Sequence, residues 1–330
     1  MKLNHIYQGD VIDRLKDLND GSVQCVVTSP PYWGLRDYGV DNQLGLEETP
    51  EEFVENLVKV FREIKRVLKD DGTVWLNLGD SYYGGGWKGA ALNENSGDIQ
   101  KAHKGTHCEE NIKHDSKHPI IKTKDLVGIP WRVAFALQAD GWYLRQDIIW
   151  HKPNPMPESV TDRCTKAHEY IFLLSKSAKY FYDADAIKEK AKYYNITGRD
   201  ATGYKDAHSF NGKHKNLMDK GQNIHSMHVK RSKGKGEPDT EGKRNKRSVW
   251  KINTKPYKEA HFAVFPEELP TLCIKAGSKE GDVILDPFFG SGTTGWVAQR
   301  LNRKWLGIEL NPEYIKIAEK RFIQEELFNG

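Results

Sequence analysis

The residues whose types and spacing best fit a chemical role are Thr28-Ser29-Pro30-Pro31-Tyr32-Trp33. They follow the apolar run from Val23 to Val27, which predicts a buried strand that ends in a rigid turn. Two consecutive prolines remove two backbone donors and fix two φ angles, so the carbonyls of Ser29 and Pro30 stay available to accept from a ligand. The Ser29 hydroxyl and a carbonyl are two acceptors for the two hydrogens of an amino group, and Tyr32 can stack on the planar ring that bears it. The segment therefore predicts an amine-binding site with Ser29, Pro30, Pro31 and Tyr32 as its catalytic residues.

A glycine-rich turn near the end of the chain is the second candidate site. The apolar strand from Val283 to Asp286 leads into Gly290, Gly292 and Gly295, which satisfy the pattern G-x-G-x-x-G. Glu309 ends the next predicted strand about twenty residues further on, where a carboxylate can accept from ribose hydroxyls. The pattern predicts a site for an adenosine-containing cofactor, and on its own it fits a nicotinamide or flavin enzyme as well.

The position of this turn in the chain argues against a dehydrogenase. A dinucleotide fold begins with the glycine-rich fingerprint, whereas only about 35 residues follow Gly295 here, enough for one strand and one helix. The other strands must come from the N-terminal part, so we predict a circularly permuted sheet in which Leu3 to Tyr7 follows the strand of Glu309. Asp10, Glu309, the glycine-rich turn and the turn at Ser29 would then share one crevice at the carboxyl ends of neighbouring strands.

Helical and strand-like patterns alternate along the chain. Apolar residues recur at helical spacing from Phe53 to Leu68, and Asp71-Gly72 separates this predicted helix from the strand Thr73 to Leu78. The alternation continues and predicts a mainly parallel α/β sheet. The later predicted elements are a helix through Trp131 to Ala139, strands near Trp142 to Trp150 and Glu169 to Leu174, and strand, helix, strand, helix from Val283 to Leu327.

Two stretches depart from this alternation. Residues 84–119 are rich in Gly, Lys and His without periodicity, so we expect a mobile loop there. Residues from about 188 to 255 resemble an inserted module: Lys188 to Lys258 contain 19 Lys and Arg against 7 Asp and Glu, although the whole chain carries only +4. Such a block suits a polyanion with flat bases, and a solvated insertion is the alternative. The aromatic residues interleaved with these charges are Tyr193, Tyr194, Tyr204, Phe210 and Trp250.

The composition is that of an ordinary soluble protein, with 38% hydrophobic and 29% charged residues among 330. The first residues contain no apolar signal region and no later segment approaches the length of a membrane span, so we expect a cytoplasmic protein. The cysteines form no C-x-x-C pair, which favours free thiols over disulfides or a ribbon-type zinc site. They are Cys25, Cys108, Cys164 and Cys273.

Histidines in the first irregular stretch include two H-x-x-x-H spacings, whose members would face one metal on a helix. The surrounding Gly and Lys argue against stable helices, so we predict no metal and keep a structural zinc as the alternative. The residues concerned are His103, His107, Cys108, His114 and His118.

Several motifs occur along the chain in a fixed order. They are Tyr7-Gln8-Gly9-Asp10, Thr28 to Tyr32, Ile148-Ile149-Trp150-His151-Lys152-Pro153, His168-Glu169-Tyr170-Ile171-Phe172, His261-Phe262-Ala263-Val264-Phe265-Pro266, Asp286 to Thr294 and Gly307-Ile308-Glu309-Leu310-Asn311. Together they resemble the permuted β-group of amino-directed DNA methyltransferases, which use S-adenosyl-L-methionine. The resemblance covers nearly the whole chain.

The resemblance implies a circularly permuted Rossmann-like methyltransferase sheet with an inserted target-recognition region. Residues 1–187 would form the catalytic part, 188–255 the basic recognition insertion and 256–330 the cofactor-binding part. The implied partner is double-stranded DNA, with a cognate restriction endonuclease as a second partner. The cofactor would be bound by Asp10, His261, Asp286, Phe288, Gly290, Ser291, Gly292, Thr293, Thr294, Glu309 and Asn311, and the DNA by Lys243, Arg244, Lys246 and Arg247.

The implied reaction takes place at an exocyclic amino group, whose lone pair is conjugated with the base and must be localised. Ser29 and the Pro30 carbonyl would accept the two N–H bonds, while Tyr32 stacks on a base flipped out of the duplex. Proximity of the amine to the activated methyl group would do much of the rest. The final proton acceptor stays open among Ser29, water and Asp80.

Several alternatives remain at this point. Methylation at carbon 5 of cytosine needs a thiolate and a Pro-Cys dipeptide, and none of the cysteines follows a proline. Ser before Pro-Pro-Tyr favours cytosine N4 by resemblance, whereas Asp or Asn there is typical of adenine N6, so adenine is the runner-up. Methylation of RNA or of a protein glutamine amide, a dinucleotide oxidoreductase and a non-catalytic DNA-binding module are the more distant alternatives.

Overall fold

A computed structural model describes residues 2–35, 37, 39–40, 42–84, 118–191, 243–254 and 265–329. The chain divides into two compact units, one made of Met1–Asp183 with Ser248–Gly330 and the other of Ala184–Arg247. The first unit contains both candidate sites and is described first. Most of the predicted loop at 84–119 lies outside the described residues.

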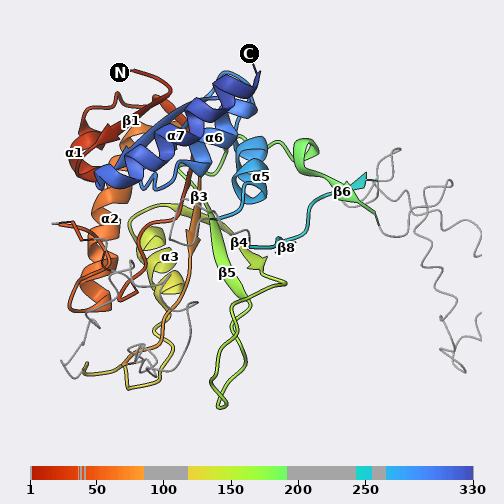
Figure 1. Ribbon diagram of the computed structural model, residues 1–330. Coiled ribbons are helices and arrows are strands. Elements are labelled where there is room, and N and C mark those ends of the chain that lie inside the picture. The colour runs from red at the N-terminus through yellow and green to blue at the C-terminus, as the bar shows by residue number, and fades with distance from the viewer. Residues whose placement is uncertain are drawn as a thin grey trace, which may run out of the picture. The chain divides into compact units, whose positions relative to one another are not determined.

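The first unit is built on an eight-stranded mixed sheet with the order β1-β10-β9-β2-β3-β5-β4-β8 (Figure 1). Strand β5 runs antiparallel to β3 and β4, and every other pair is parallel. The prediction of a mainly parallel α/β sheet is confirmed. The strands are β1 His5–Gln8, β2 Val23–Thr28, β3 Leu68–Leu78, β4 Tyr143–His151, β5 His168–Ser175, β8 Val249–Lys251, β9 Val283–Asp286 and β10 Lys304–Glu309.

The N-terminal strand β1 forms the edge of the sheet, next to the strands β10 and β9 from the C-terminal part of the chain. Strand β1 pairs in parallel with β10, with His5 opposite Leu306 and Gln8 opposite Glu309. This pairing is the one that the permuted arrangement predicts, although the strand covers His5–Gln8 rather than Leu3 to Tyr7. It places the end of β1 beside Glu309.

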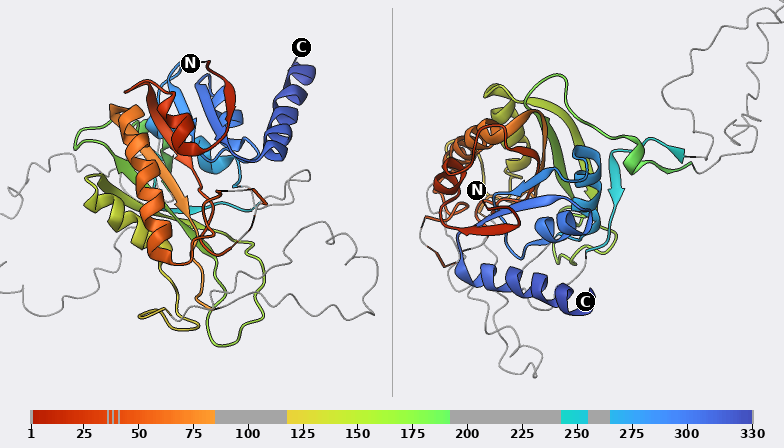
Figure 2. Two further views of the ribbon diagram at one scale, coloured as in Figure 1. Left: turned by 90° about the vertical axis from the view of Figure 1, so that its left-hand side faces the viewer. Right: turned by 90° about the horizontal axis from the view of Figure 1, so that it is seen from above.

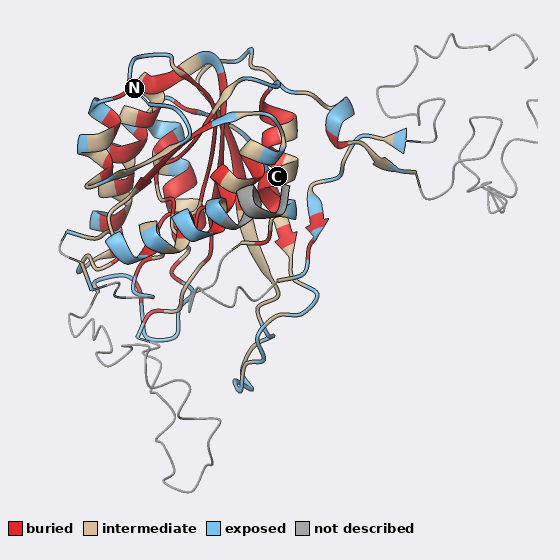
Figure 3. Cartoon of the chain, turned by 45° about the horizontal axis from the view of Figure 1, so that its top comes forward, coloured by how far each residue is buried: buried red, intermediate tan, exposed pale blue. Residues whose placement is uncertain are grey.

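Two groups of helices cover the two faces of the sheet (Figure 2). Side chains of β2 and β3 alternate between them: Val26 and Val74 pack in the cluster formed with α2 and α3, whereas Cys25 and Trp75 lie against Gly277 at the end of α5. The buried residues gather on the central strands and on the helix faces turned toward them (Figure 3). The helices are α1 Val11–Lys16, α2 Pro50–Val67, α3 Ile129–Ala139, α5 Glu268–Gly277, α6 Thr293–Arg300 and α7 Pro312–Asn329.

Helix α2 shows how the sequence sets its own boundaries. Thr49 caps it with a capping box to Glu52, and Pro50 occupies the first turn, where its missing N–H costs nothing. The helix ends at Val67, earlier than predicted, because Leu68 adopts an extended backbone and begins β3 directly. Asp71-Gly72 were expected to separate the helix from the strand, but they lie within β3. The pairing of β3 with β2 accommodates them by a shift of register between Val23 and Cys25.

Strand β8 corrects one part of the sequence analysis. Trp250 was predicted to belong to the basic insertion, but it is buried in the first unit, with its ring centroid 6.2 Å from that of Trp75. Its strand pairs with β4, from Ile149 opposite Val249 to His151 opposite Lys251. The burial of a large aromatic ring explains why this segment joins the sheet although the residues around it are basic.

The described part of the second unit is small. It holds a single 3-10 turn at Asp185–Ile187 and an antiparallel pair of short strands, β6 Glu189–Lys190 and β7 Lys243–Arg244. Among the described residues of the whole chain, no helix has the length and apolar character needed to cross a membrane.

Candidate active site

The turn at Ser29 follows β2 and is held by a hydrogen-bond network that converges on Tyr32. The Tyr32 hydroxyl donates to Glu169 Oε2 at 2.9 Å. It accepts from Asn77 Nδ2 at 3.0 Å and from Ser29 Oγ at 3.3 Å. Asn77 Nδ2 also donates to Glu169 Oε2 at 2.8 Å, and Lys152 forms an ion pair with Oε1 of the same carboxylate. The turn is therefore anchored to β3, β4 and β5.

Lys152 and Glu169 were predicted only as parts of motifs, and Asn77 was not predicted. Gly79, which follows β3, was also missed. A Cβ atom at Gly79 would lie 2.5 Å from Cε2 of Tyr32, so only glycine lets the ring occupy this place. These contacts join segments far apart in the chain, and the types of these residues carry no local signal for them.

Beneath the turn, Asp286 links the end of β2 to the glycine-rich turn. Its Oδ1 accepts from Thr28 Oγ1 at 2.7 Å and from the Phe288 N–H at 3.1 Å, and Oδ2 lies 2.7 Å from Thr294 Oγ1. Burial raises the pKa of Asp286 to about 7, although these hydrogen bonds oppose the shift. Asp286 and Thr294 were predicted to bind cofactor, and the structure shows their side chains bonded within the protein.

The Thr294 hydroxyl explains why a protonated Asp286 fits this place. Thr294 Oγ1 also lies 3.2 Å from the Val27 carbonyl, which can only accept. One hydroxyl proton cannot satisfy both Val27 and a carboxylate. When Asp286 carries a proton, Asp286 donates to Thr294 and Thr294 donates to Val27.

We expect Asp286→Asn to lose a pH dependence of stability that the wild type has. The pKa of Asp286 is about 7 in the folded protein, against about 3.9 for an unfolded Asp. The folded state then holds more protons between about pH 4 and 7, so the free energy of unfolding falls as the pH rises through that range. Asparagine copies the protonated form, and the stability of the variant relative to wild type should increase between pH 5 and pH 8.

Urea unfolding of the cofactor-free protein at these two pH values measures this change. Asp13→Asn on the exposed surface is the control, and its effect should be equal at both. A difference between wild type and Asp286→Asn that does not change with pH would contradict the expectation.

The predicted cofactor side of the site lies at the ends of β1, β10 and β9. Glu309 Oε2 accepts from the Gly290 N–H at 2.7 Å and Oε1 from the Asn311 N–H at 2.8 Å, and burial raises the pKa of this carboxyl. Each oxygen keeps capacity for one further donor, such as a ribose hydroxyl. Gly290 has a φ of +50°, and a Cβ atom there would meet no heavy atom within 4 Å. Asp10 caps α1 by accepting from Ile12 and Asp13.

The N6/N4 DNA methylase family model matches residues 23–320. The chain belongs to this family. It is 46% identical to the type II methyltransferase M.Cfr9I of Citrobacter freundii, over 97% of this chain and 88% of the relative. It is 45% identical to M.SmaI of Serratia marcescens, over 97% of this chain and 90% of the relative.

Solved structures show the fold of this DNA methylase. The cytosine-N4-specific PvuII DNA methyltransferase superposes with a TM-score of 0.60 at 19% identity, over 96% of this chain and 85% of that one. A putative DNA modification methylase from Thermus thermophilus, solved in complex with S-adenosyl-L-methionine, gives 0.55 at 23% identity, over 97% and 93% of the two chains.

Three glycines around Phe289 in the methylase leave room for its aromatic ring. A Cβ atom at Gly295 would lie 2.6 Å from Phe289 Cζ, and one at Gly307 would lie 2.4 Å from that ring. Gly292 has a φ of +78°, and its Cβ would lie 3.1 Å from Phe289 and from Ala318. The prediction gave Gly292 the task of admitting the cofactor, but a side chain there would enter the aromatic packing of Phe289.

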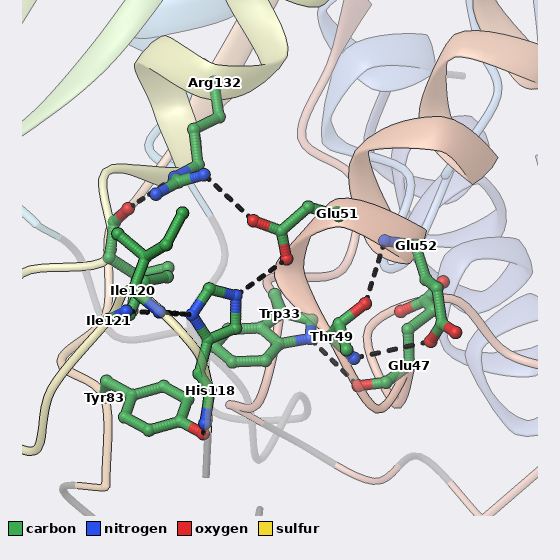
Figure 4. Close-up of polar contacts among 11 residues, drawn as sticks. Trp33, Glu47, Thr49, Glu51, Glu52, Tyr83, His118, Ile120, Ile121 and Arg132 are labelled. Carbon is green, nitrogen blue, oxygen red and sulfur yellow. Dashed lines mark hydrogen bonds and ion pairs between the residues drawn. The ribbon is translucent and has the colours of Figure 1, made fainter. Parts of the chain in front are cut away.

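Trp33, next to the turn at Ser29, packs inside the methylase rather than lining an open pocket. It is buried and stacks with Tyr83 at 6.5 Å between centroids, and its Nε1 donates to the Glu47 carbonyl at 3.0 Å. Figure 4 shows how His118 continues this cluster: its Nδ1 accepts from the Ile120 and Ile121 N–H groups, so its Nε2 carries the proton and donates to Glu51. The hydrogen-bonded ring of His118 fits a structural role.

The remaining predicted residues have mixed positions. Thr293 is buried and accepts from Arg321 at 3.0 Å, so its hydroxyl is engaged within the methylase. His261 lies outside the described residues. So do His103, His107, Cys108 and His114, and no group of three or more His, Cys, Asp or Glu in the described ranges has the arrangement of a metal site.

Proposed function

We propose that this DNA methylase transfers a methyl group from S-adenosyl-L-methionine to the exocyclic amino group of a flipped base in duplex DNA. The observation that carries the proposal is the hydrogen-bonded turn from Ser29 to Tyr32, which follows β2 and lies one strand from the glycine-rich turn and two strands from Glu309. Because β2, β9 and β10 run parallel, their carboxyl ends share one edge of the sheet, which supports an amine acceptor and a ribose acceptor in one site.

Glu309 and the open space beside Gly290 fit an adenosine-containing cofactor. The carboxylate keeps acceptor capacity on both oxygens, and the Gly290 backbone can be approached closely because no side chain fills that place. S-adenosyl-L-methionine would supply a methyl group activated by positive sulfur. Ser29 Oγ and the Pro30 carbonyl would accept the amine hydrogens and localise the nitrogen lone pair.

Cytosine N4 is the base position that we favour, and adenine N6 is the alternative. The preference rests on Ser29 before Pro-Pro-Tyr, which resembles the N4 enzymes. It agrees with the specificity that the PvuII enzyme carries in its name, although the likeness to that enzyme is one of fold. Family membership makes an oxidoreductase the weaker interpretation of the glycine-rich turn.

Long-read sequencing of DNA from cells that express the protein tests the proposal directly, because it reports the modified base and its sequence context together. N4-methylcytosine at a defined site would support it in full, and N6-methyladenine would support the alternative. Absence of modified DNA, together with methyl transfer to RNA or protein in vitro, would contradict it. We also propose a restriction endonuclease with the same site as the partner, because the relatives are type II methyltransferases.

Part of the positive charge that is predicted to contact DNA in the second unit is balanced by ion pairs within that unit. Arg244 and Arg247 both donate to Glu189 Oε1, at 3.1 and 2.6 Å, and these pairs lower the pKa of Glu189 although burial opposes them. Two of the four predicted DNA contacts thus neutralise a carboxylate within the unit. Replacing Lys243 and Lys246 would leave these ion pairs in place, so these two lysines are the ones to test first.

We expect Lys243→Ala/Lys246→Ala to weaken DNA binding and to flatten its salt dependence. Two lost phosphate contacts lower the slope of log affinity against log salt by roughly 2, since each contributes about 0.9. Cofactor affinity should not change. Filter binding at several salt concentrations measures the slope, with Lys16→Ala/Lys316→Ala as a control that removes the same charge from exposed helix positions. Equal slopes for the two double variants would favour a solvated insertion.

A further inference from the structure

We propose that Glu169 is a positioning residue for methyl transfer: through Tyr32 it fixes the direction in which Ser29 donates its proton, and it receives the proton that the amino group releases. The inference rests on the proposed function. It names a proton acceptor that the sequence left open.

The number of protons at the Tyr32 hydroxyl determines the direction of each hydrogen bond that it forms. A phenol has one proton and accepts through its lone pairs, and among the described residues Ser29, Asn77 and Glu169 lie within hydrogen-bond distance of the Tyr32 hydroxyl. The Asn77 amide nitrogen can only donate, and an ionised Glu169 can only accept. Tyr32 therefore donates to Glu169 Oε2 and accepts from Asn77. The Ser29 hydroxyl must then donate to Tyr32, which leaves its own lone pairs to accept from an amine.

Asn77 can hold only one orientation in this network. The opposite orientation would place its carbonyl oxygen against the Glu169 carboxylate and would remove the bonds of 2.8 and 3.0 Å. Asn77 is 1% exposed on β3, and its Oδ1 is buried without a hydrogen-bond partner among the described residues. A buried acceptor without a donor is costly, so the two bonds donated by Nδ2 must outweigh this cost to hold the side chain in this orientation.

Lys152 supplies the charge that balances Glu169. Its ammonium pairs with Oε1, the oxygen that does not face Tyr32, and lies 4.4 Å from the ring centroid of Trp150. The two side chains are 19% and 15% exposed, so solvent screens this pair less than a surface pair. His151 pairs with His168 across β4 and β5. This pairing brings their chain neighbours Lys152 and Glu169 together.

Asp80, the acceptor suggested by the sequence, is committed elsewhere. Its Oδ1 accepts from the N–H groups of Ser81, Gly128 and Ile129 at 2.9 to 3.0 Å, and so holds the start of α3. A protonated Asp80 would weaken these bonds. Glu169 has the hydrogen-bonded path to Ser29.

The proton balance of the step is simple. The amino nitrogen forms a bond to the methyl carbon as the bond from that carbon to the sulfonium sulfur breaks, with its electron pair staying on sulfur, and the nitrogen loses one proton to Ser29 Oγ. The Ser29 proton passes to Tyr32 Oη, and the Tyr32 proton passes to Glu169 Oε2. Ser29 and Tyr32 end with one proton each, as they began, and Glu169 changes from carboxylate to carboxylic acid before it releases the proton to solvent.

The test compares Glu169→Gln, Tyr32→Phe and the double variant in single-turnover methyl transfer. The substrate is a duplex oligonucleotide with the site found by sequencing, at saturating S-adenosyl-L-methionine. The glutamine can still accept from Tyr32 but cannot take a proton, and phenylalanine keeps the ring but interrupts the path. We expect each single variant to be slower by roughly 100-fold, with DNA and cofactor affinities within twofold of wild type.

Two further results would separate proton transfer from a structural role. The double variant should be no slower than the slower single variant, because both changes interrupt one path. The wild-type rate should show a solvent deuterium isotope effect, because protons move along the path, and this effect should be smaller in Glu169→Gln. Glu158→Gln is the matched control on the same hairpin: its carboxylate pairs with Arg163, and its rate should equal that of wild type.

The proposal is wrong if Glu169→Gln transfers methyl groups within threefold of wild type, or if the two rate losses multiply. It is also wrong if DNA affinity falls as much as the rate. Should Glu169→Gln fail to fold, Tyr32→Phe decides alone: a wild-type rate with the wild-type solvent isotope effect would overturn the path. A wild type that transfers no methyl group to DNA would instead reject the proposed function, before any variant is compared.

Discussion

Ser29→Ala should slow methyl transfer by roughly 100-fold or more while duplex DNA and S-adenosyl-L-methionine still bind. The Ser29 hydroxyl is an acceptor that matters most when the amine nitrogen becomes tetrahedral, so its loss raises the barrier without removing ground-state affinity. Its hydrogen bond to Tyr32 also sets which way it can accept. Single-turnover rates at saturating ligands, beside separate binding measurements, give the two quantities.

Ser22→Ala is the matched control for this change, because Ser22 is an exposed serine that donates to the Asn19 carbonyl. Tyr32→Ala should fail differently from Ser29→Ala. It removes a stacking surface worth about 1–3 kcal/mol for an unstacked base, so capture of the target base should weaken as well as the rate. If both Ser29→Ala and Tyr32→Ala methylate DNA at the wild-type rate, the turn is only structural.

Gly292→Leu should abolish cofactor binding and also destabilise the fold. Any side chain here needs a left-handed backbone, and its Cβ would lie 3.1 Å from Phe289 and Ala318. Backbone strain and overpacking together cost roughly 2–5 kcal/mol. Gly292 precedes α6, so a shift there moves Thr294 and its bond to Asp286. Thermal unfolding and calorimetry with S-adenosyl-L-methionine measure the two effects.

Gly290→Ala separates these effects. Its Cβ would enter open space beside the Gly290–Glu309 bond, so the loss of cofactor affinity should exceed the loss of stability. Wild-type stability in Gly292→Leu would show that the aromatic packing around Phe289 can adjust. Unchanged cofactor affinity in both variants would move the cofactor away from this turn.

The sequence predicted those parts of the fold that depend on local patterns and on rules of connection. The strand before Ser29 is marked by apolar residues and its end by two prolines. The pairing of β1 with β10 could be predicted because too few residues follow Gly295 to complete a sheet. The capping box at Thr49 is also a local signal.

The features that the sequence did not predict depend on contacts between side chains that are far apart in the chain. Nothing near Glu169 in sequence indicates that it accepts from Tyr32, because the contact spans 137 residues. Gly292 and Gly295 matched a cofactor pattern, whereas the structure uses them to make room for Phe289. Trp250 was assigned by the charge of its neighbours, although its own burial decides its place. A sequence pattern identifies residue types and their spacing, whereas the role of each residue depends on the contacts that it makes in the folded protein.

The pairing of β1 with β10 also bears on how the protein is made. Strand β1 leaves the ribosome well before its partner β10, because about 300 residues separate the two strands in the sequence. At about 5–20 residues per second, β1 waits roughly 15–60 seconds for β10. During that time β2 lacks β9, and its edge is open to pairing with another chain. Glu309 is made later than either strand β1 or the turn at Ser29, so a nascent chain contains the proposed catalytic turn well before the carboxylate proposed to hold the cofactor, and we expect no methyl transfer before that point.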